Sequence, residues 1–236
     1  MRRPIERLLA CLVLCLLGGP AALSAQTTTL DEGSFRLYIA GRAIGTENFN
    51  IRQSGTGDDA IIIAQGSIAV DTAGAPQEVR TILRVEGASL RPSDYDVTVR
   101  GAADQRIVGR VIGGRFSARI VSPAGEQMRE YLASEGAVLV DAGVVHHHYF
   151  LARRAEAGAR RIPIIIPRLN RQVTGTVEEA GRESVQVGGR TVQARRFAIA
   201  LAGGPEIQLW VDDRGRVLRL EVPQRGFEAV RTGAPR

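Results

Sequence analysis

Lysine is absent from the 236-residue chain, and all 31 of its basic residues are arginines. A nucleic-acid-binding protein would gather such charges into a patch and, for single strands, interleave them with aromatic side chains. The arginines are instead spread along the whole chain, and aromatic residues account for only 5% of it. We therefore interpret the arginines as an ordinary solvated surface and expect no nucleic-acid partner.

Cysteine is confined to the first 25 residues, at Cys11 and Cys15. This segment has the layout of a secretory signal peptide, with three early arginines, an apolar run over 8–17, then Gly-Gly-Pro and small residues. The apolar run is shorter than the roughly 20 residues of a transmembrane helix. We predict a signal peptide over residues 1–25, cleaved within 22–25, and a periplasmic location without a transmembrane segment.

The stretch LLAC, which ends at Cys11, is similar to a lipoprotein cleavage box, but the apolar run follows this cysteine instead of preceding it. We therefore favour ordinary cleavage, which leaves a mature chain without cysteine. Such a chain has no thiol nucleophile, no disulfide and no thiolate-bound metal. Loss of three arginines and Glu6 lowers the formal net charge from +6 to +4, and roughly 210 residues remain, which is enough to bury a core.

Short apolar stretches separated by Gly, Asp, Asn and Pro run from residue 34 to residue 231 and predict an all-β fold. In SFRLYIAG, Phe35, Leu37 and Ile39 occupy alternate positions, as in a strand that rests one face on a core. We expect a curved antiparallel sheet or incomplete barrel, formed by residues 26–236 as a single β-rich domain.

Three hairpins are predicted. RIVGRVIGGRFSARIV would turn at Gly113 and Gly114, and SVQVGGRTVQARRFAIAL at Gly188 and Gly189, because both central positions of a two-residue turn favour positive φ. EIQLWVDDRGRVLRLEVP would reverse through residues 212–215, an aspartate-rich loop that contains glycine.

One short helix is predicted over residues 123–134, in the segment SPAGEQMREYLASEG. Its serine would cap the free amides, and its proline suits the first helical position. An apolar stripe for core packing would follow, formed by Met128, Tyr131 and Leu132.

Histidine occurs three times, side by side in VVHHHYF, residues 144–150. We interpret this stretch as a strand, which would send His146 and His148 to one face and His147 to the other. Two imidazoles on one face can begin a zinc site, but here the third protein ligand would have to be a carboxylate. The nearest, Asp141, has an odd offset from His146 and would face the opposite way. We therefore predict no metal and no cofactor.

Catalytic groups are scarce. The sequence has no G-x-S-x-G elbow, and its paired carboxylates at 58–59, 178–179 and 212–213 fall in expected turns. Glycosidases instead hold two carboxyl groups across a cleft. We expect a protein that is not an enzyme; the alternative is a metal-dependent hydrolase that uses the stretch from His146 to His148.

The stretch RIPIIIPRL is very apolar, and Pro163 and Pro167 confine it to an edge, a bulge or a loop because proline lacks a ladder donor. An unpaired apolar edge needs a cover, which the protein's own chain or a bound apolar molecule would supply. We favour the protein's own chain. The candidate ligand-binding residues are Ile164, Ile165, Ile166, Leu169 and Trp210.

Three stretches, FRLYIAGRAIGTENFNI, YFLARR and LWVDDRGRVLRLEVP, together resemble a family of exported, uncharacterised Gram-negative envelope proteins. This is the domain-of-unknown-function family numbered 3108, with its relatives. The resemblance implies a curved antiparallel sheet, similar to the open barrels of periplasmic lipoprotein carriers, and it implies no catalytic residue. The matching positions are Gly41, Gly45, Trp210, Asp212 and Gly215.

These patterns together predict a non-catalytic periplasmic protein. Its curved sheet would bind a lipid-like or other hydrophobic molecule, or an envelope partner. Binding would be driven by burial of apolar surface, at about 25 cal/mol per Å² removed from water.

Overall fold

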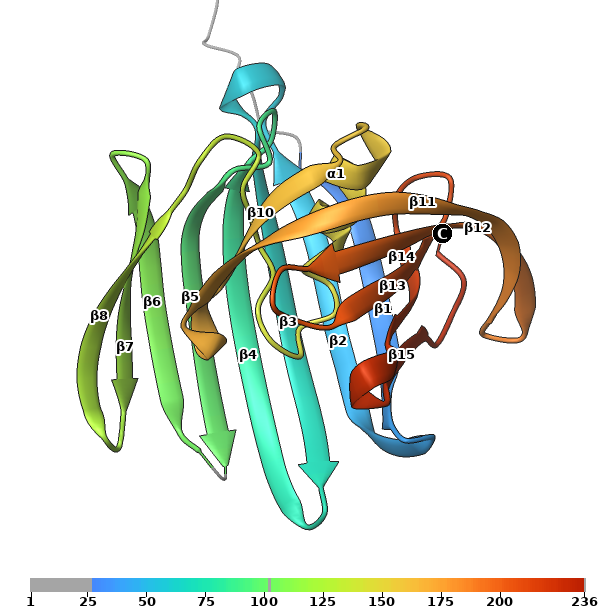
Figure 1. The fold of residues 1–236 in the computed structure, drawn as a ribbon, viewed down its shortest axis with the longest axis horizontal. Coiled ribbons are helices and arrows are strands. Elements are labelled where there is room, and N and C mark those ends of the chain that lie inside the picture. Colours follow the sequence, from blue (N-terminus) through green and yellow to red (C-terminus); the bar gives the residue numbers. More distant parts are fainter. Residues whose placement is uncertain (1–26, 102, 236) are drawn as a thin grey trace, which may run out of the picture.

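A computed structural model describes residues 27–101 and 103–235 of the chain. The signal peptide predicted over residues 1–25 lies outside this described part. Over the described residues the chain forms a single 15-stranded sheet, one α-helix and three short 3-10 turns. The predicted all-β fold, a curved and mainly antiparallel sheet, is confirmed (Figure 1).

In chain order the elements are β1 (Thr27–Ile39), β2 (Arg42–Ser54), η1 (Gly57–Asp59), β3 (Ile61–Thr72), β4 (Ala75–Glu86), β5 (Pro92–Gly101), β6 (Gln105–Ile112), β7 (Arg115–Ser122), β8 (Gly125–Leu132), β9 (Val138–Leu139), α1 (His148–Glu156), β10 (Arg161–Ile166), η2 (Pro167–Leu169), β11 (Arg171–Val187), β12 (Arg190–Leu201), β13 (Glu206–Val211), β14 (Val217–Val222), η3 (Pro223–Arg225) and β15 (Phe227–Arg231).

The sheet consists of two halves that meet where the first and last strands pair. Strands β1 to β8 follow one another in sheet order, and β15 adds to the free side of β1, from Phe35 opposite Arg231 to Ile39 opposite Phe227. From β15 the order runs backwards through β14 to β9. Figure 1 shows β2 to β8 as a broad wall, with the orange and red strands β10 to β15 crossing in front of it. The main hydrophobic core contains buried side chains from both halves.

Strand β8 at one end of the sheet is joined to the opposite half by side chains. Gln172 of β11 accepts a hydrogen bond from the Leu132 N–H (2.9 Å) and donates one to the Leu132 carbonyl (2.7 Å). The Tyr131 hydroxyl donates to Asn170 Oδ1 (3.0 Å). The Gln172 amide therefore bonds the backbone of β8 as a neighbouring strand would, and part of an otherwise open edge is satisfied.

All three predicted hairpins are confirmed. Gly113 and Gly114 turn between β6 and β7, and Gly188 and Gly189 turn between β11 and β12, all with positive φ between 56° and 77°. Strands β13 and β14 form the third, around residues 212–216.

The position predicted for the helix, residues 123–134, is wrong. The segment forms the turn at Pro123 and Ala124 and then strand β8, which pairs with β7 from Ser122 opposite Gly125 onward. Strand β8 is the last strand of the sheet and is exposed on both faces except at Tyr131. Its residues are therefore mostly polar, and such a polar segment is easily mistaken for an exposed helix. Pairing along the whole of β7 outweighs the local helix signal.

The helix lies instead at α1, in the segment HYFLARRAE. Leucine, arginine and alanine favour a helix, and the buried positions include Tyr149, Leu151, Ala152 and Ala155. Gly158 follows with φ of 85°, and its N–H donates to the Ala155 carbonyl (3.0 Å). A glycine in the left-handed region is the usual end of a helix.

Candidate ligand-binding site

The histidine stretch is not a strand. Residues 144–147 form a loop that leads into α1, and all three imidazoles are buried, whereas a strand would have sent them to alternate faces. Glu47 of β2 causes this conformation, because its carboxylate accepts the backbone N–H groups of Val145 (2.8 Å) and His146 (2.7 Å). A buried anion that binds free amides at the start of a helix is stabilised by the helix dipole.

The His146 ring packs against one face of the wall, over strands β2, β3 and β4. Its Nδ1 lies 2.7 Å from Glu47 Oε1, its Nε2 lies 3.5 Å from the Thr81 hydroxyl, and it stacks on Phe49 with ring centres 5.7 Å apart. Gly66 of β3 leaves room for the ring: a Cβ at this position would lie 2.3 Å from His146 Cε1. The ring therefore fills a space that only a glycine leaves open.

Asp141, before the histidines, joins the wall to strand β10 and its turn. Its Oδ2 accepts hydrogen bonds from the Tyr95 hydroxyl (2.6 Å) and from Arg168 Nε (3.1 Å), while Oδ1 accepts the N–H groups of Ala142 and Arg168 (both 2.9 Å). Burial and the adjacent Asp141 carboxylate raise the pKa of Tyr95 well above its usual value. Both oxygens of Asp141 are thus fully engaged within the protein.

His147 and His148 are neutral at physiological pH. His147 Nδ1 accepts the Asp141 N–H (3.3 Å), and burial, with neighbouring His146, holds the pKa of His147 well below its usual value. Burial lowers the pKa of His148 to about 4, although its Nδ1 lies 3.0 Å from the Val145 carbonyl oxygen. Desolvation disfavours the charged imidazolium, so both rings remain uncharged.

Thr81, His146 and Glu47 follow the order of hydroxyl, imidazole and carboxylate that hydrolases use. All three side chains lie in the core, with 2%, 1% and 0% of their surface exposed. The Thr81 hydroxyl is therefore enclosed by the core in this structure. Over residues 27–101 and 103–235, no cluster of three histidine, cysteine or acidic residues is placed to bind a metal ion.

An apolar hollow of about 280 Å³ lies beside this polar cluster. Strands β10, β11 and β13 to β15 surround it, and the loop 140–145 with His148 and Leu151 closes one side. Its aliphatic and aromatic lining includes Ile39, Val140, Ile164, Ile166, Val173, Leu201, Ile207, Leu220, Val222 and Phe227.

Three of the five predicted ligand-binding residues line this hollow: Ile164, Ile166 and Leu169. Ile165 alternates to the other face of β10 and is fully buried in the main core. Part of the Pro-bracketed stretch thus lines the hollow. The stretch is not an unpaired edge, because β9 and β11 pair with the two sides of β10.

Trp210 lies away from the hollow. It belongs to a second small core with Val187 and Leu218, and its indole N–H donates to Glu183 of β11. In β13, Trp210 lies between Leu209 and Val211, which face the main core. Because side chains alternate along a strand, this pattern already indicated that Trp210 points to the other face of the sheet.

Sequence reasoning missed the two basic residues of the lining, Arg171 and Arg225. Each belongs to a Pro-containing 3-10 turn or lies just after one: Arg171 is two residues beyond η2, and Arg225 is the last residue of η3. The repeated pattern of a strand followed by proline, in RIPIIIPRLNR and RLEVPQRG, was the available signal.

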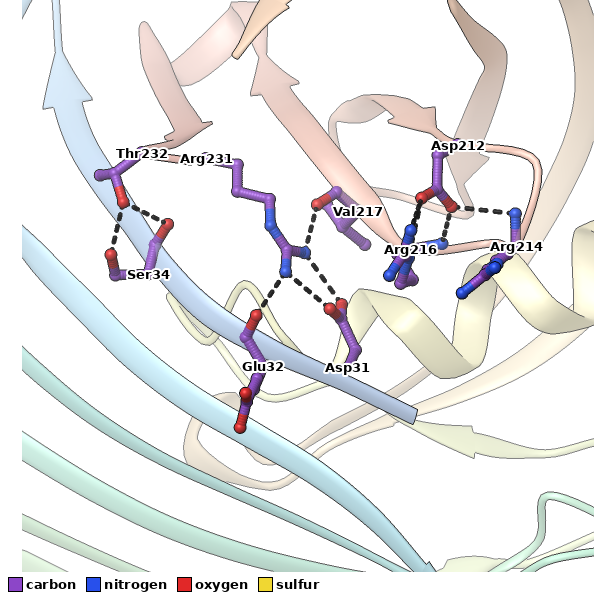
Figure 2. Close-up of polar contacts among 9 residues, drawn as sticks. All are labelled: Asp31, Glu32, Ser34, Asp212, Arg214, Arg216, Val217, Arg231 and Thr232. Carbon is purple, nitrogen blue, oxygen red and sulfur yellow. Dashed lines mark hydrogen bonds and ion pairs between the residues drawn. The ribbon is translucent and has the colours of Figure 1, made fainter. Parts of the chain in front are cut away.

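A second buried polar group ties the two ends of the chain together (Figure 2). Arg231 of β15 donates to both carboxylate oxygens of Asp31 in β1 (3.0 and 2.6 Å) and to the carbonyls of Val217 (3.2 Å) and Glu32 (2.5 Å). Its guanidinium carbon lies 5.3 Å from the centre of the Phe49 ring. We refer to the Asp31–Arg231 pair as the clasp.

The turn between β13 and β14 lies beside the clasp (Figure 2). Asp212 accepts the N–H groups of Arg214 (3.0 Å) and Arg216 (2.9 Å) and pairs with the Arg216 side chain. Asp212 therefore shapes the turn, as expected for aspartate in a reversal. None of these contacts lies in the apolar hollow.

Comparison with known proteins places the fold among uncharacterised families. Residues 164–232, from β10 to just beyond β15, match the model of a domain of unknown function, DUF6134. The resemblance to an uncharacterised domain family is thus supported, although not to the family numbered 3108 specifically. No curated protein matches the chain.

One solved structure is similar over nearly the whole described fold. It is a beta-barrel-like protein of the domain of unknown function DUF1849 from Brucella abortus, with 12% sequence identity and a TM-score of 0.56. The alignment covers 89% of this chain and 98% of that one. This likeness shows a barrel-like fold.

Among the described residues, none of the helical segments has the length and apolar character needed to cross a bilayer.

Proposed function

We propose that the protein is an exported, non-catalytic binding protein of the cell envelope, which holds an apolar chain of a lipid-like ligand in the hollow. The observation that carries the proposal is a cavity of about 280 Å³ with a mainly apolar lining. Small-molecule sites span about 300–1,000 Å³, so this one suits a single narrow chain.

The polar groups next to the hollow support a binding role. His148 reaches the lining as a neutral ring, because burial lowers its pKa to about 4. The Asp141 carboxylate also reaches it, but four donors already occupy its oxygens. A guest chain in the interior therefore meets no uncompensated charge, and burial of its surface contributes about 25 cal/mol per Å².

A pair of matched substitutions tests this proposal. Val173 and Val111 are both half-buried valines packed against the main core, but only Val173 lines the hollow. We expect Val173→Phe to fill the cavity and remove lipid that co-purifies from the periplasmic fraction, measured by mass spectrometry. Val111→Phe adds the same volume at a half-buried position away from the hollow and should retain the lipid.

Two results would contradict the binding role. One is purified protein that never carries an apolar molecule and binds no neutral fluorescent apolar probe. The other is an equal loss of ligand in both phenylalanine variants, which would show that the hollow does not contain the site.

The alternative is a metal-dependent hydrolase that uses the stretch from His146 to His148, in which the His146 imidazole already lies 2.7 Å from the Glu47 carboxylate. Metal analysis of the purified protein and of a His146→Ala/His148→Ala variant separates the two functions. Stoichiometric zinc that disappears in the variant would favour the hydrolase, whereas ligand binding without metal favours the binding protein.

A further inference from the structure

The opening of the hollow is marked by the lining residues that remain accessible to solvent. Ile39 and Leu169 are 37% and 41% exposed, and Arg225 is exposed in the adjoining turn η3. The half-buried Arg171 of β11 lies at the same hollow. The two arginines therefore lie where an apolar interior meets solvent.

In the part of the chain that the structure describes, no carboxylate neutralises either arginine. An Arg171 Nη donates to the Gly203 carbonyl (3.0 Å), which holds the side chain beside the turn between β12 and β13. Within residues 27–101 and 103–235, neither Arg171 nor Arg225 forms an ion pair with a carboxylate, and the one acidic residue of the lining, Asp141, already pairs with Arg168. The opening thus carries two uncompensated positive charges.

We propose that the ligand of the hollow is a single-chain anionic amphiphile, with its chain inside and its carboxylate or phosphate head at Arg171 and Arg225. This inference rests on the binding function proposed above and adds the class of ligand. Guanidinium groups bind carboxylate and phosphate through paired N–H donors, and such charge-assisted bonds are stronger than neutral ones. An uncharged ligand of equal length gains only the burial of its chain.

Competition against a neutral fluorescent probe, N-phenylnaphthylamine, tests the head-group preference at neutral pH. The competitors are decanoate, decyl phosphate and decanol, which share one chain and differ in the head. We expect the better of the two anions to bind about tenfold more tightly than decanol, because hydrogen bonds to charged groups are stronger than neutral ones. Added salt should weaken the anions and leave decanol unchanged. The ranking of decanoate against decyl phosphate identifies the preferred head.

A double variant, Arg171→Gln/Arg225→Gln, should abolish the preference for the anions while decanol binds as before. The control is Arg161→Gln/Arg190→Gln, which removes the same charge from two exposed arginines that do not line the hollow. This control should keep the preference, which separates a local effect from a change in net charge.

The outcomes distinguish the two proposals. If decanol and the anions bind equally, or if the control loses the preference as fully as the double variant, the anionic ligand is refuted and the hollow remains a binding site. If none of the three displaces the probe and the probe itself does not bind, the binding function fails and the ligand class with it.

Discussion

Two of the buried carboxylates, Asp31 and Glu47, are stabilised in different ways, although the partner of each lies near Phe49. Asp31 pairs with the permanently charged Arg231, which lies 200 residues further along the chain. Glu47 binds two backbone amides and an imidazole at the start of α1. The clasp joins the ends of the chain, whereas Glu47 sets the conformation of a loop that borders the hollow.

The difference shows that the same core contains one polar group that joins β1 to β15 and another that shapes the wall of the hollow. A charge pair inside the protein is stable only when both partners are present, so the clasp holds the seam between β1 and β15 in one arrangement. Glu47 of β2 instead accepts backbone N–H groups of the loop 144–147. Asp141, whose oxygens are all engaged within the protein, and the neutral His148 add no free charge to the interior of the hollow. An apolar guest is compatible with this second arrangement.

The largest expected effect comes from breaking the clasp. Arg231→Met leaves Asp31 buried without its partner and should lower the free energy of unfolding by about 3–5 kcal/mol. The double variant Asp31→Leu/Arg231→Met should recover much of this loss, because no buried charge remains. Urea denaturation measures both.

The exposed pair Arg106–Asp96 provides the control for the clasp. Arg106→Met should change stability little, because solvent-exposed ion pairs contribute at most about 1 kcal/mol. A double clasp variant no more stable than Arg231→Met alone would show that the pair does not act through charge neutralisation.

A smaller effect is expected at Glu47. Glu47→Gln keeps the shape of the side chain, but one carboxylate oxygen becomes an NH₂ donor that faces backbone N–H groups. An unsatisfied buried donor costs about 1–3 kcal/mol, which denaturation would detect. Hydrogen exchange should locate the change at residues 144–150, whereas the Arg231 variants should affect β1 and β15. Identical exchange patterns in both would contradict the separation of the two sites.

The smallest effect is a dependence on pH at the start of the helix. The pKa of His148 falls from about 6.5 in the unfolded chain to about 4 in the folded protein, so below about pH 6.5 the unfolded chain binds the extra proton. The free energy of unfolding should therefore decrease as the pH is lowered. This residue contributes a loss of roughly 0.5–1 kcal/mol between about pH 7 and about pH 6.

His148→Gln removes this titration. Urea midpoints at the two pH values should show a smaller loss in the variant than in the parent protein. An equal loss would mean that His148 is not the group responsible, and buried His147, whose pKa is also lowered, would be the next to replace.

The strands and hairpins were predictable because their signals are local. Alternation in SFRLYIAG buries Phe35 and Leu37, and the paired glycines adopt the positive φ that a two-residue turn requires. Ile39 departs from the pattern, since it is 37% exposed at the opening of the hollow.

The helix and the histidine loop were not predictable in the same way. LARRAEAG carries a local helix signal, but SPAGEQMREYL carries one too, and only the pairing of β8 with β7 decides between them. The histidine stretch bends into a loop because Glu47, 98 residues before Val145, accepts the backbone N–H groups of Val145 and His146. No pattern within VVHHHYF contains that information.

The sequence by itself determined the sheet, its turns and the apolar stretch around Ile164, because backbone preference and alternation act between neighbours in the chain. Tertiary structure alone decided which of those apolar residues face an empty space, and placed Arg171 and Arg225 at its opening. A cavity is what remains between elements once they have packed, so its walls come from strands far apart in the chain and no local pattern encodes it.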